Sequence, residues 1–184
     1  MFESNNPSAL RSQREITEAL INLMKEIPYE EISVKQILLE SKLAKKTFYR
    51  NYESKDDVLL SLIRKNLKEY FSLVDAGNAD VLTTIFDFAA SNKELLMIMD
   101  RNDMLHLVLR CMNENIDFHK SGTPSEGNPF VNLFKGLESE YLIALNIGAV
   151  WNVITLWVHC GMKEEPDCVR ETIRSYIERL GGAF

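Results

Sequence analysis

The chain has 184 residues, of which 46% are hydrophobic, and its formal net charge is −6. This hydrophobic content argues against intrinsic disorder, and the length suffices for one large domain or two small ones. Residues 1–70 carry 12 Lys and Arg against 11 Asp and Glu, whereas residues 71–184 carry 9 against 16. The acidic average therefore hides an N-terminal part in which positive charge can be locally concentrated.

The cysteines are odd in number and form no CxxC pair: Cys111, Cys160 and Cys168. This usage predicts a protein of the reducing cytoplasm without a disulfide framework, and the Cys and His spacing matches no closed metal site. The N-terminus lacks the apolar core of a signal peptide. Residues 141–160 carry no formal charge and are long enough to span a bilayer, but their polar Asn146 and Asn152 favour a buried core or interface helix.

Apolar residues recur at helical spacing, and no segment shows the alternation of a half-buried strand, so the chain is predicted to be all-α. The first helix is expected over residues 12–27. Ser12 and Glu15 have the spacing of its capping box, although the helix can also start earlier, near Pro7. Pro28 ends it.

A helix, a tight turn and a second short helix follow. Ser33 and Gln36 are spaced as a capping box for the former, Lys42 lies in the turn, and the latter runs over about residues 44–52. Phe48 and its neighbours on the same side are expected to face the core. This pattern is that of a helix-turn-helix.

Ser54 is expected to cap a fourth helix. A polar break at residues 75–80 then separates an N-terminal domain, residues 1–71, from a C-terminal helical bundle, residues 72–184. The remaining helices are expected over residues 80–91, 92–100, 103–118, 130–161 and 167–180, with a polar loop at 120–129.

The second short helix carries most of the local positive charge. Its outward side is predicted to present Lys45, Lys46, Thr47, Tyr49, Arg50 and Asn51. Lys and Arg side chains reach guanine O6 and N7, and a Thr methyl can touch a thymine methyl. Tyr49 and Lys55, with the backbone N–H groups that begin the fourth helix, are suited to phosphates. The residues therefore predict a helix that reads the major groove of DNA.

The arrangement over residues 12–71 resembles the N-terminal domain of the TetR (tetracycline repressor) family of transcriptional regulators. The resemblance is strongest between residues 47 and 59, where Thr-Phe-Tyr is followed by an aromatic residue, Ser-Lys and a Leu. It implies a homodimeric, all-helical repressor that binds a pseudo-palindromic double-stranded operator. It also implies base contacts by Lys45, Lys46, Thr47 and Arg50, and backbone contacts by Ser33, Tyr49, Asn51 and Lys55.

The C-terminal half resembles the family through residues 141–166, which look like its last two helices. The resemblance implies that these helices pair with their copies in the dimer, with candidate interface residues Tyr141, Leu145, Trp157, Ile173, Tyr176 and Ile177. Adaptable methionines and nearby aromatic residues suggest a pocket for a small-molecule inducer, with candidates Phe86, Met97, Met104, Met112 and Trp151. No cofactor is expected.

Two departures from the family are visible, because Lys42 stands where Gly is usual in the turn and Ala44 stands where Ser or Thr usually caps the recognition helix. No phosphate-binding Gly loop, HExxH or GxSxG motif occurs, so an enzyme is not expected. Two alternatives stay open for the basic helix. It can be a solvated face or a site for RNA or an acidic protein, or the chain can be a helix-turn-helix adaptor that a protein partner regulates without a small ligand.

Overall fold

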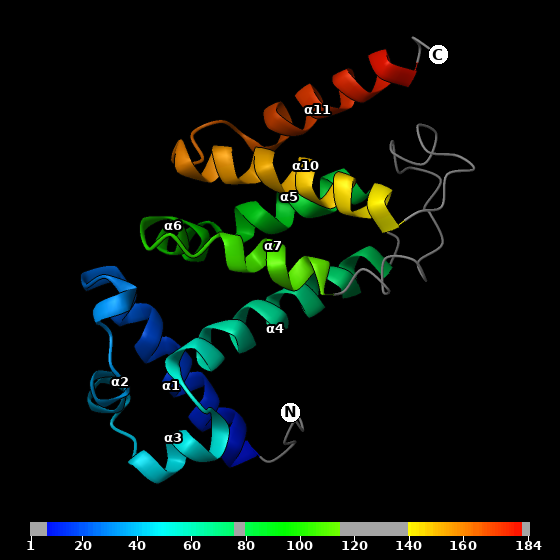
Figure 1. Cartoon of the computed structure of the whole chain (residues 1–184). Helices are drawn as coiled ribbons and strands as arrows, with labels where there is room; N and C mark the ends of the chain where they lie inside the picture. The colour runs from blue at the N-terminus through cyan, green and yellow to red at the C-terminus, as the bar shows by residue number, and fades with distance from the viewer. Residues whose placement is uncertain (1–6, 76–79, 115–139, 182–184) are drawn as a thin grey trace. The chain divides into compact units, whose positions relative to one another are not determined.

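The computed structural model describes residues 7–75, 80–114 and 140–181, and every regular element within these ranges is a helix (Figure 1). The all-α prediction is therefore confirmed. The chain divides into two compact units, residues 1–65 and 66–184, and the division falls inside helix α4 (Lys55–Asp75). The predicted boundary after residue 71 lies in the same helix. The predicted loop at 120–129 lies outside the described residues.

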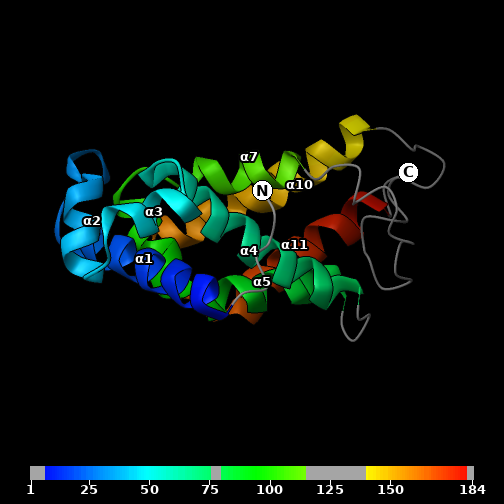
Figure 2. The ribbon, with the colours of Figure 1, turned by 90° about the horizontal axis from the view of Figure 1, so that it is seen from below.

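Unit 1 contains α1 (Pro7–Glu26), the 3-10 helix η1 (Tyr29–Glu31), α2 (Val34–Ser41), α3 (Lys45–Asn51) and the first turns of α4. Both α2 and α3 pack against α1, as Figures 1 and 2 show from two directions. Its core is apolar and fully buried, and includes Ile16, Leu20, Ile37, Phe48, Val58 and Leu59. Burial of each such side chain stabilises the unit by roughly 1.5–3 kcal/mol.

Helix α1 begins at Pro7, so the earlier of the two expected starts is correct. Ser12 is not a cap, because it lies inside the helix, where its hydroxyl donates to the carbonyl oxygen of Ser8 at 3.0 Å. A Ser-x-x-Glu pattern inside a helix is indistinguishable by spacing alone from one that opens it.

The caps of the following helices agree with the sequence. Ser33 and Gln36 form the predicted capping box of α2, and the Ser54 hydroxyl accepts the Asp57 N–H at the start of α4. Ala44 occupies the N-cap of α3 without any side-chain hydrogen bond. Lys42 ends α2 in the left-handed conformation, with φ 56° and ψ 29°.

Replacing Lys42 with glycine is expected to raise the free energy of unfolding of unit 1 by about 1 kcal/mol, because a glycine lacks the Cβ that strains a left-handed residue. Urea denaturation followed by circular dichroism measures the change. The matched control is Lys35→Gly inside α2, which should lower stability by about 1 kcal/mol. Destabilisation by both substitutions would contradict the strained turn.

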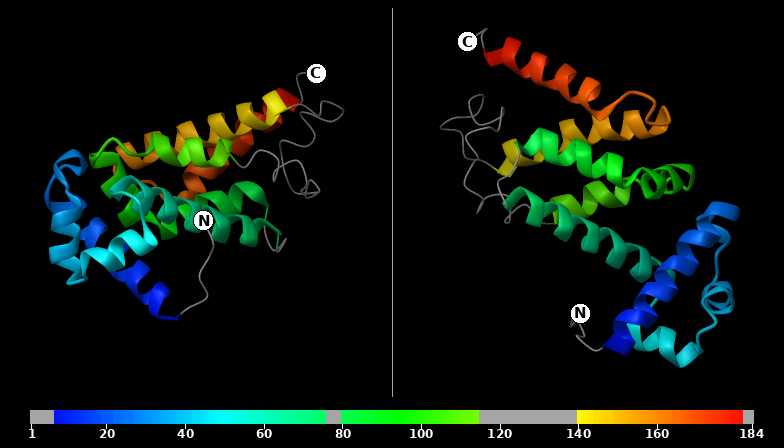
Figure 3. Two further views of the ribbon diagram at one scale, coloured as in Figure 1. Left: turned by 60° about the horizontal axis from the view of Figure 1, so that its bottom comes forward. Right: turned by 180° about the vertical axis from the view of Figure 1, so that it is seen from behind.

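Unit 2 contains, after the end of α4, helices α5 (Val81–Ser91), α6 (Lys93–Arg101), α7 (His106–Asn113), α10 (Glu140–His159) and α11 (Pro166–Gly181). Helix α10 packs against α6 and α7, and α11 packs against α5. Figure 3 shows α10 and α11 running in opposite directions, joined by a short turn. Among the described helices, none combines the length and the apolar character that crossing a membrane requires.

Helix α11 is tied to the start of α5 by an ion pair between Arg174 and Asp80, whose nitrogen and oxygen lie 3.1 Å apart. Asp80 is also the N-cap of α5, where its carboxylate accepts the N–H and the hydroxyl of Thr83. Burial raises the pKa of Asp80, but these hydrogen bonds and the Arg174 charge outweigh it, so the pKa lies below its usual value.

Candidate nucleic-acid interface

The basic helix α3 presents its cations to solvent while its apolar side anchors it. Lys45, Lys46 and Arg50 are exposed, whereas the Phe48 side chain is completely buried. Within the part of the chain that the structure describes, no carboxylate forms an ion pair with these three cations. Unit 1 therefore carries an unneutralised positive surface on a helix that its core holds in place.

Tyr49 projects beside this surface. Its side chain is 51% exposed, and its ring meets the Phe48 ring edge-on at a centroid distance of 5.3 Å. The Lys45 ammonium lies 5.8 Å from the centroid of the Tyr49 ring, which is a cation–π distance. Thr47 is half-buried on the same helix. These placements agree with the predicted outward side of α3.

Asn51 corrects that prediction, because its side chain does not face outward. It is 9% exposed, and its amide nitrogen donates to the Thr47 carbonyl oxygen at 2.7 Å. Asn51 lies three residues after Phe48, so the helical period places it on the buried side. The spacing between Phe48 and Asn51 is visible in the sequence and predicts that Asn51 is buried.

Lys55 makes contacts within the chain that the sequence does not indicate. Its ammonium donates to the carbonyl oxygens of Tyr29 at 2.7 Å and Glu30 at 3.1 Å, and it lies 4.5 Å from the centroid of the Tyr29 ring. Near the predicted phosphate site at the start of α4, the Asp57 carboxylate accepts the Glu53 N–H at 3.0 Å. Lys55 thus bonds to its own chain.

Ser33 is exposed at the start of α2, as a backbone-contacting residue must be, but its hydroxyl is engaged in the capping box. The hydroxyl donates to the Gln36 side-chain oxygen at 2.6 Å and accepts from the Gln36 N–H at 3.3 Å. Its role in binding stays a prediction.

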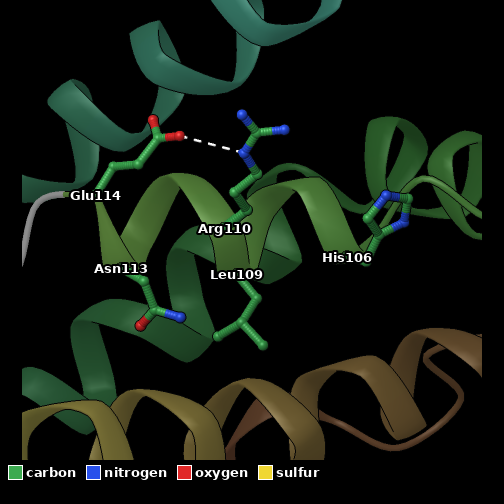
Figure 4. A pocket seen from close by; sticks show the side chains of 5 residues that line it. All are labelled: His106, Leu109, Arg110, Asn113 and Glu114. Atoms are coloured by element: carbon green, nitrogen blue, oxygen red, sulfur yellow. Dashed lines mark hydrogen bonds and ion pairs between the residues drawn. The ribbon is translucent and has the colours of Figure 1, made fainter.

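The residues predicted to line an inducer pocket lie mostly in the core of unit 2. Phe86, Met112 and Trp151 are buried, and Met97 and Met104 are partly exposed. A shallow surface pocket in the described part of the chain lies along α7 instead, and none of the five predicted residues lines it (Figure 4). In Figure 4, Arg110 and Glu114, which form an ion pair at 3.3 Å, point to the opposite side of α7 from Leu109.

The residues predicted for the dimer interface divide into two groups. Tyr141, Leu145 and Tyr176 are exposed, and Ile173 is partly exposed. Trp157 and Ile177 are instead buried in their own subunit, and the Trp157 indole donates to the Glu164 carbonyl oxygen at 3.1 Å.

Leu156 is a further candidate for the dimer interface that was not predicted from the sequence, and its side chain is 63% exposed on α10. Because α10 is apolar on nearly every side, its sequence does not show which side faces outward.

No family model and no curated protein sequence matches this chain. A solved structure does match it, the fatty acid degradation regulator FadR from Bacillus halodurans, with a TM-score of 0.68 and 15% sequence identity. The match covers 95% of this chain and 96% of that chain. The two proteins share a fold. The shared all-helical fold extends over both units.

Proposed function

We propose that this chain is a DNA-binding transcriptional regulator of the TetR type. The observation that carries the proposal is the exposed, unneutralised cationic side of α3, held by the buried Phe48 ring in a helix-turn-helix unit. A short helix of this kind fits the major groove of B-DNA. The fold shared with a regulator, FadR, supports the same conclusion.

Within this proposal, Lys45, Lys46, Thr47 and Arg50 face base edges, and Tyr49 and Ser33 contact the sugar–phosphate backbone. The buried Asn51 holds the α3 backbone instead of DNA, because its amide is bonded to Thr47. The protein acts in the cytoplasm, where it has access to the chromosome.

Selection of bound DNA from a random duplex pool tests the function. The expected result is a two-fold-symmetric consensus whose half-sites are centred about 34–36 Å apart, one turn of B-DNA. Enrichment of no sequence would overturn the proposal, and so would tighter binding of a random single-stranded RNA pool than of the duplex pool under the same conditions.

A homodimer formed through α10 and α11 is part of the proposal, because a symmetric operator needs two recognition helices. The outer side of α10 supports it. Tyr141, Leu145 and Leu156 are exposed there, and a Cβ added to Gly148 would meet no atom of the described residues within 4 Å. A glycine inside a helix costs about 1 kcal/mol relative to alanine, and the described part of the same chain gives no packing reason for it.

Leu156→Asp is expected to weaken the dimer at least about 100-fold, because two carboxylates, one from each copy, would lose water in the interface. Sedimentation velocity measures the change. Leu39→Asp is the matched control, since Leu39 is 69% exposed on α2, far from α10 in the sequence, and should leave the dimer intact. Equal effects of both substitutions would remove α10 from the interface.

A small-molecule inducer that binds unit 2 and releases the operator completes the proposal. Such a ligand would shift the dimer away from the spacing that matches successive major grooves. Screening metabolite extracts for release of the purified protein from its selected operator tests this step. Release only by a second protein would instead favour a regulator that is controlled by a protein partner.

A further inference from the structure

The first turn of α4 is fastened to η1 through four side-chain contacts. The Lys55 ammonium donates to the carbonyl oxygens of Tyr29 and Glu30, and lies over the Tyr29 ring. The next residue, Asp56, accepts a hydrogen bond from the Tyr29 hydroxyl. Lys55, Asp56 and Tyr29 are therefore linked by direct contacts, and we call this group of three residues the α4 clamp.

The clamp is well supported on the side of Tyr29. That residue is 6% exposed, so its ring is held by surrounding atoms and offers Lys55 a fixed surface. Burial, the hydrogen bond to Asp56 and the Asp56 charge all raise the pKa of the Tyr29 phenol. The hydroxyl consequently keeps its proton and remains a donor to Asp56 at neutral pH.

The start of α4 is poorly suited to a phosphate. Asp56 and Asp57 occupy its first turn. The Asp57 carboxylate accepts a hydrogen bond from the Glu53 N–H, and the Asp57 N–H donates one to the Ser54 hydroxyl. An approaching phosphate would meet two carboxylates, and the neighbouring ammonium of Lys55 is already bonded to two carbonyl oxygens.

We propose that Lys55 is a positioning residue, which fixes α4 against the segment leading into α2 and does not bind a DNA phosphate. This inference rests on the proposed DNA-binding function. Tyr29 precedes the Ser33 cap of α2 by four residues, and α3 ends four residues before Lys55. The clamp thus joins the chain on both sides of the α2–α3 pair and fixes the orientation of the recognition helix.

The salt dependence of DNA affinity separates the two roles. Each phosphate that a protein cation neutralises adds about 0.9 to the slope of log K against log salt concentration. Lys55→Met removes the ammonium and keeps most of the aliphatic stem, and Lys46→Met is the matched change on α3. Affinity for a fluorescein-labelled duplex of mixed sequence is measured by anisotropy over a range of NaCl concentrations.

The expected result is that Lys55→Met lowers affinity while its salt slope equals that of the unsubstituted protein. On a duplex of mixed sequence Lys46 has no selected base to read and lies against phosphates, so Lys46→Met lowers the slope by about 0.9. A slope lowered equally by both substitutions would overturn the positioning role, and so would an unchanged affinity for Lys55→Met. If the unsubstituted chain bound without salt dependence, the proposed function would fail as well.

Operator spacing provides a readout that a loss of stability alone would not move. On duplexes whose selected half-sites are brought one base pair closer or further apart, Lys55→Met should discriminate less than the unsubstituted protein, because its recognition helix is less firmly oriented. Should Lys55→Met fail to fold, Tyr29→Phe removes only the hydroxyl and should show the same loss of discrimination. Full discrimination by the folded variant would overturn the proposal.

Discussion

Phe48→Ala is expected to lower the free energy of unfolding of unit 1 by about 3–5 kcal/mol. The Phe48 side chain is completely buried, and its ring lies 5.3 Å from the Tyr49 ring and 6.1 Å from the Tyr52 ring, measured between centroids. Its removal would leave a cavity under a helix of only seven residues, which cannot persist on its own. Domains are commonly stable by about 5–15 kcal/mol, so the substitution would remove a large part of the stability of unit 1.

Urea denaturation followed by far-ultraviolet circular dichroism measures this loss, with the protein prepared free of DNA. Tyr49→Ala is the matched control, because it removes the neighbouring aromatic ring, which is half exposed. It should cost less than about 1 kcal/mol and yet weaken DNA binding. If the two substitutions destabilised the protein equally, the assignment of Phe48 to the core side of α3 would be wrong.

Local chemistry was enough to predict most of the fold of unit 1. The Ser33–Gln36 box and the Ser54 cap are short-range hydrogen bonds between residues a few positions apart, and the structure has both. Pro28 cannot continue a helix, and α1 ends at Glu26. The start of the first helix was harder to predict, because Ser12 meets the spacing rule for a cap while Pro7, five residues earlier, is also a suitable first helical residue.

The contacts of Asn51 and Lys55 were not predicted, for different reasons. The spacing of Asn51 from Phe48 predicts that Asn51 is buried, whereas its polar side chain suggests exposure, and the helical period is the correct signal. Lys55 was not predictable, because its partners are main-chain oxygens of residues 29 and 30. Contacts between a side chain and a distant backbone leave no pattern in the sequence.

The two sides of α10 could not be separated from sequence either. Trp151, Ile154 and Trp157 face the core, whereas Leu145 and Leu156 face outward, and all five are large and apolar. Only packing against α6 and α7 decides between them. The same holds for Ile177 on α11, which is buried while Tyr176 beside it is exposed.

Removing the three exposed cations of α3 should have the largest effect on DNA binding. A good contact to a base contributes about 1–3 kcal/mol of discrimination, so the triple variant Lys45→Ala, Lys46→Ala, Arg50→Ala should bind its selected operator at least about 100-fold more weakly. Its salt slope should fall by about 0.9 for each cation that neutralised a phosphate. Phe48 keeps α3 folded, because none of the three side chains contributes to the core.

The matched control changes net charge by the same amount on unit 2, through Arg101→Ala, Arg110→Ala and Lys163→Ala, at positions that are all exposed and lie outside α10 and α11. If long-range attraction to DNA were the only force, both triple variants would lose affinity alike, since net charge acts over the whole molecule. If α3 reads bases in the major groove, the control variant should instead keep nearly full affinity and sequence preference. Equal losses of affinity in the two triple variants would show that the cations act as diffuse charge, and would contradict base reading by α3.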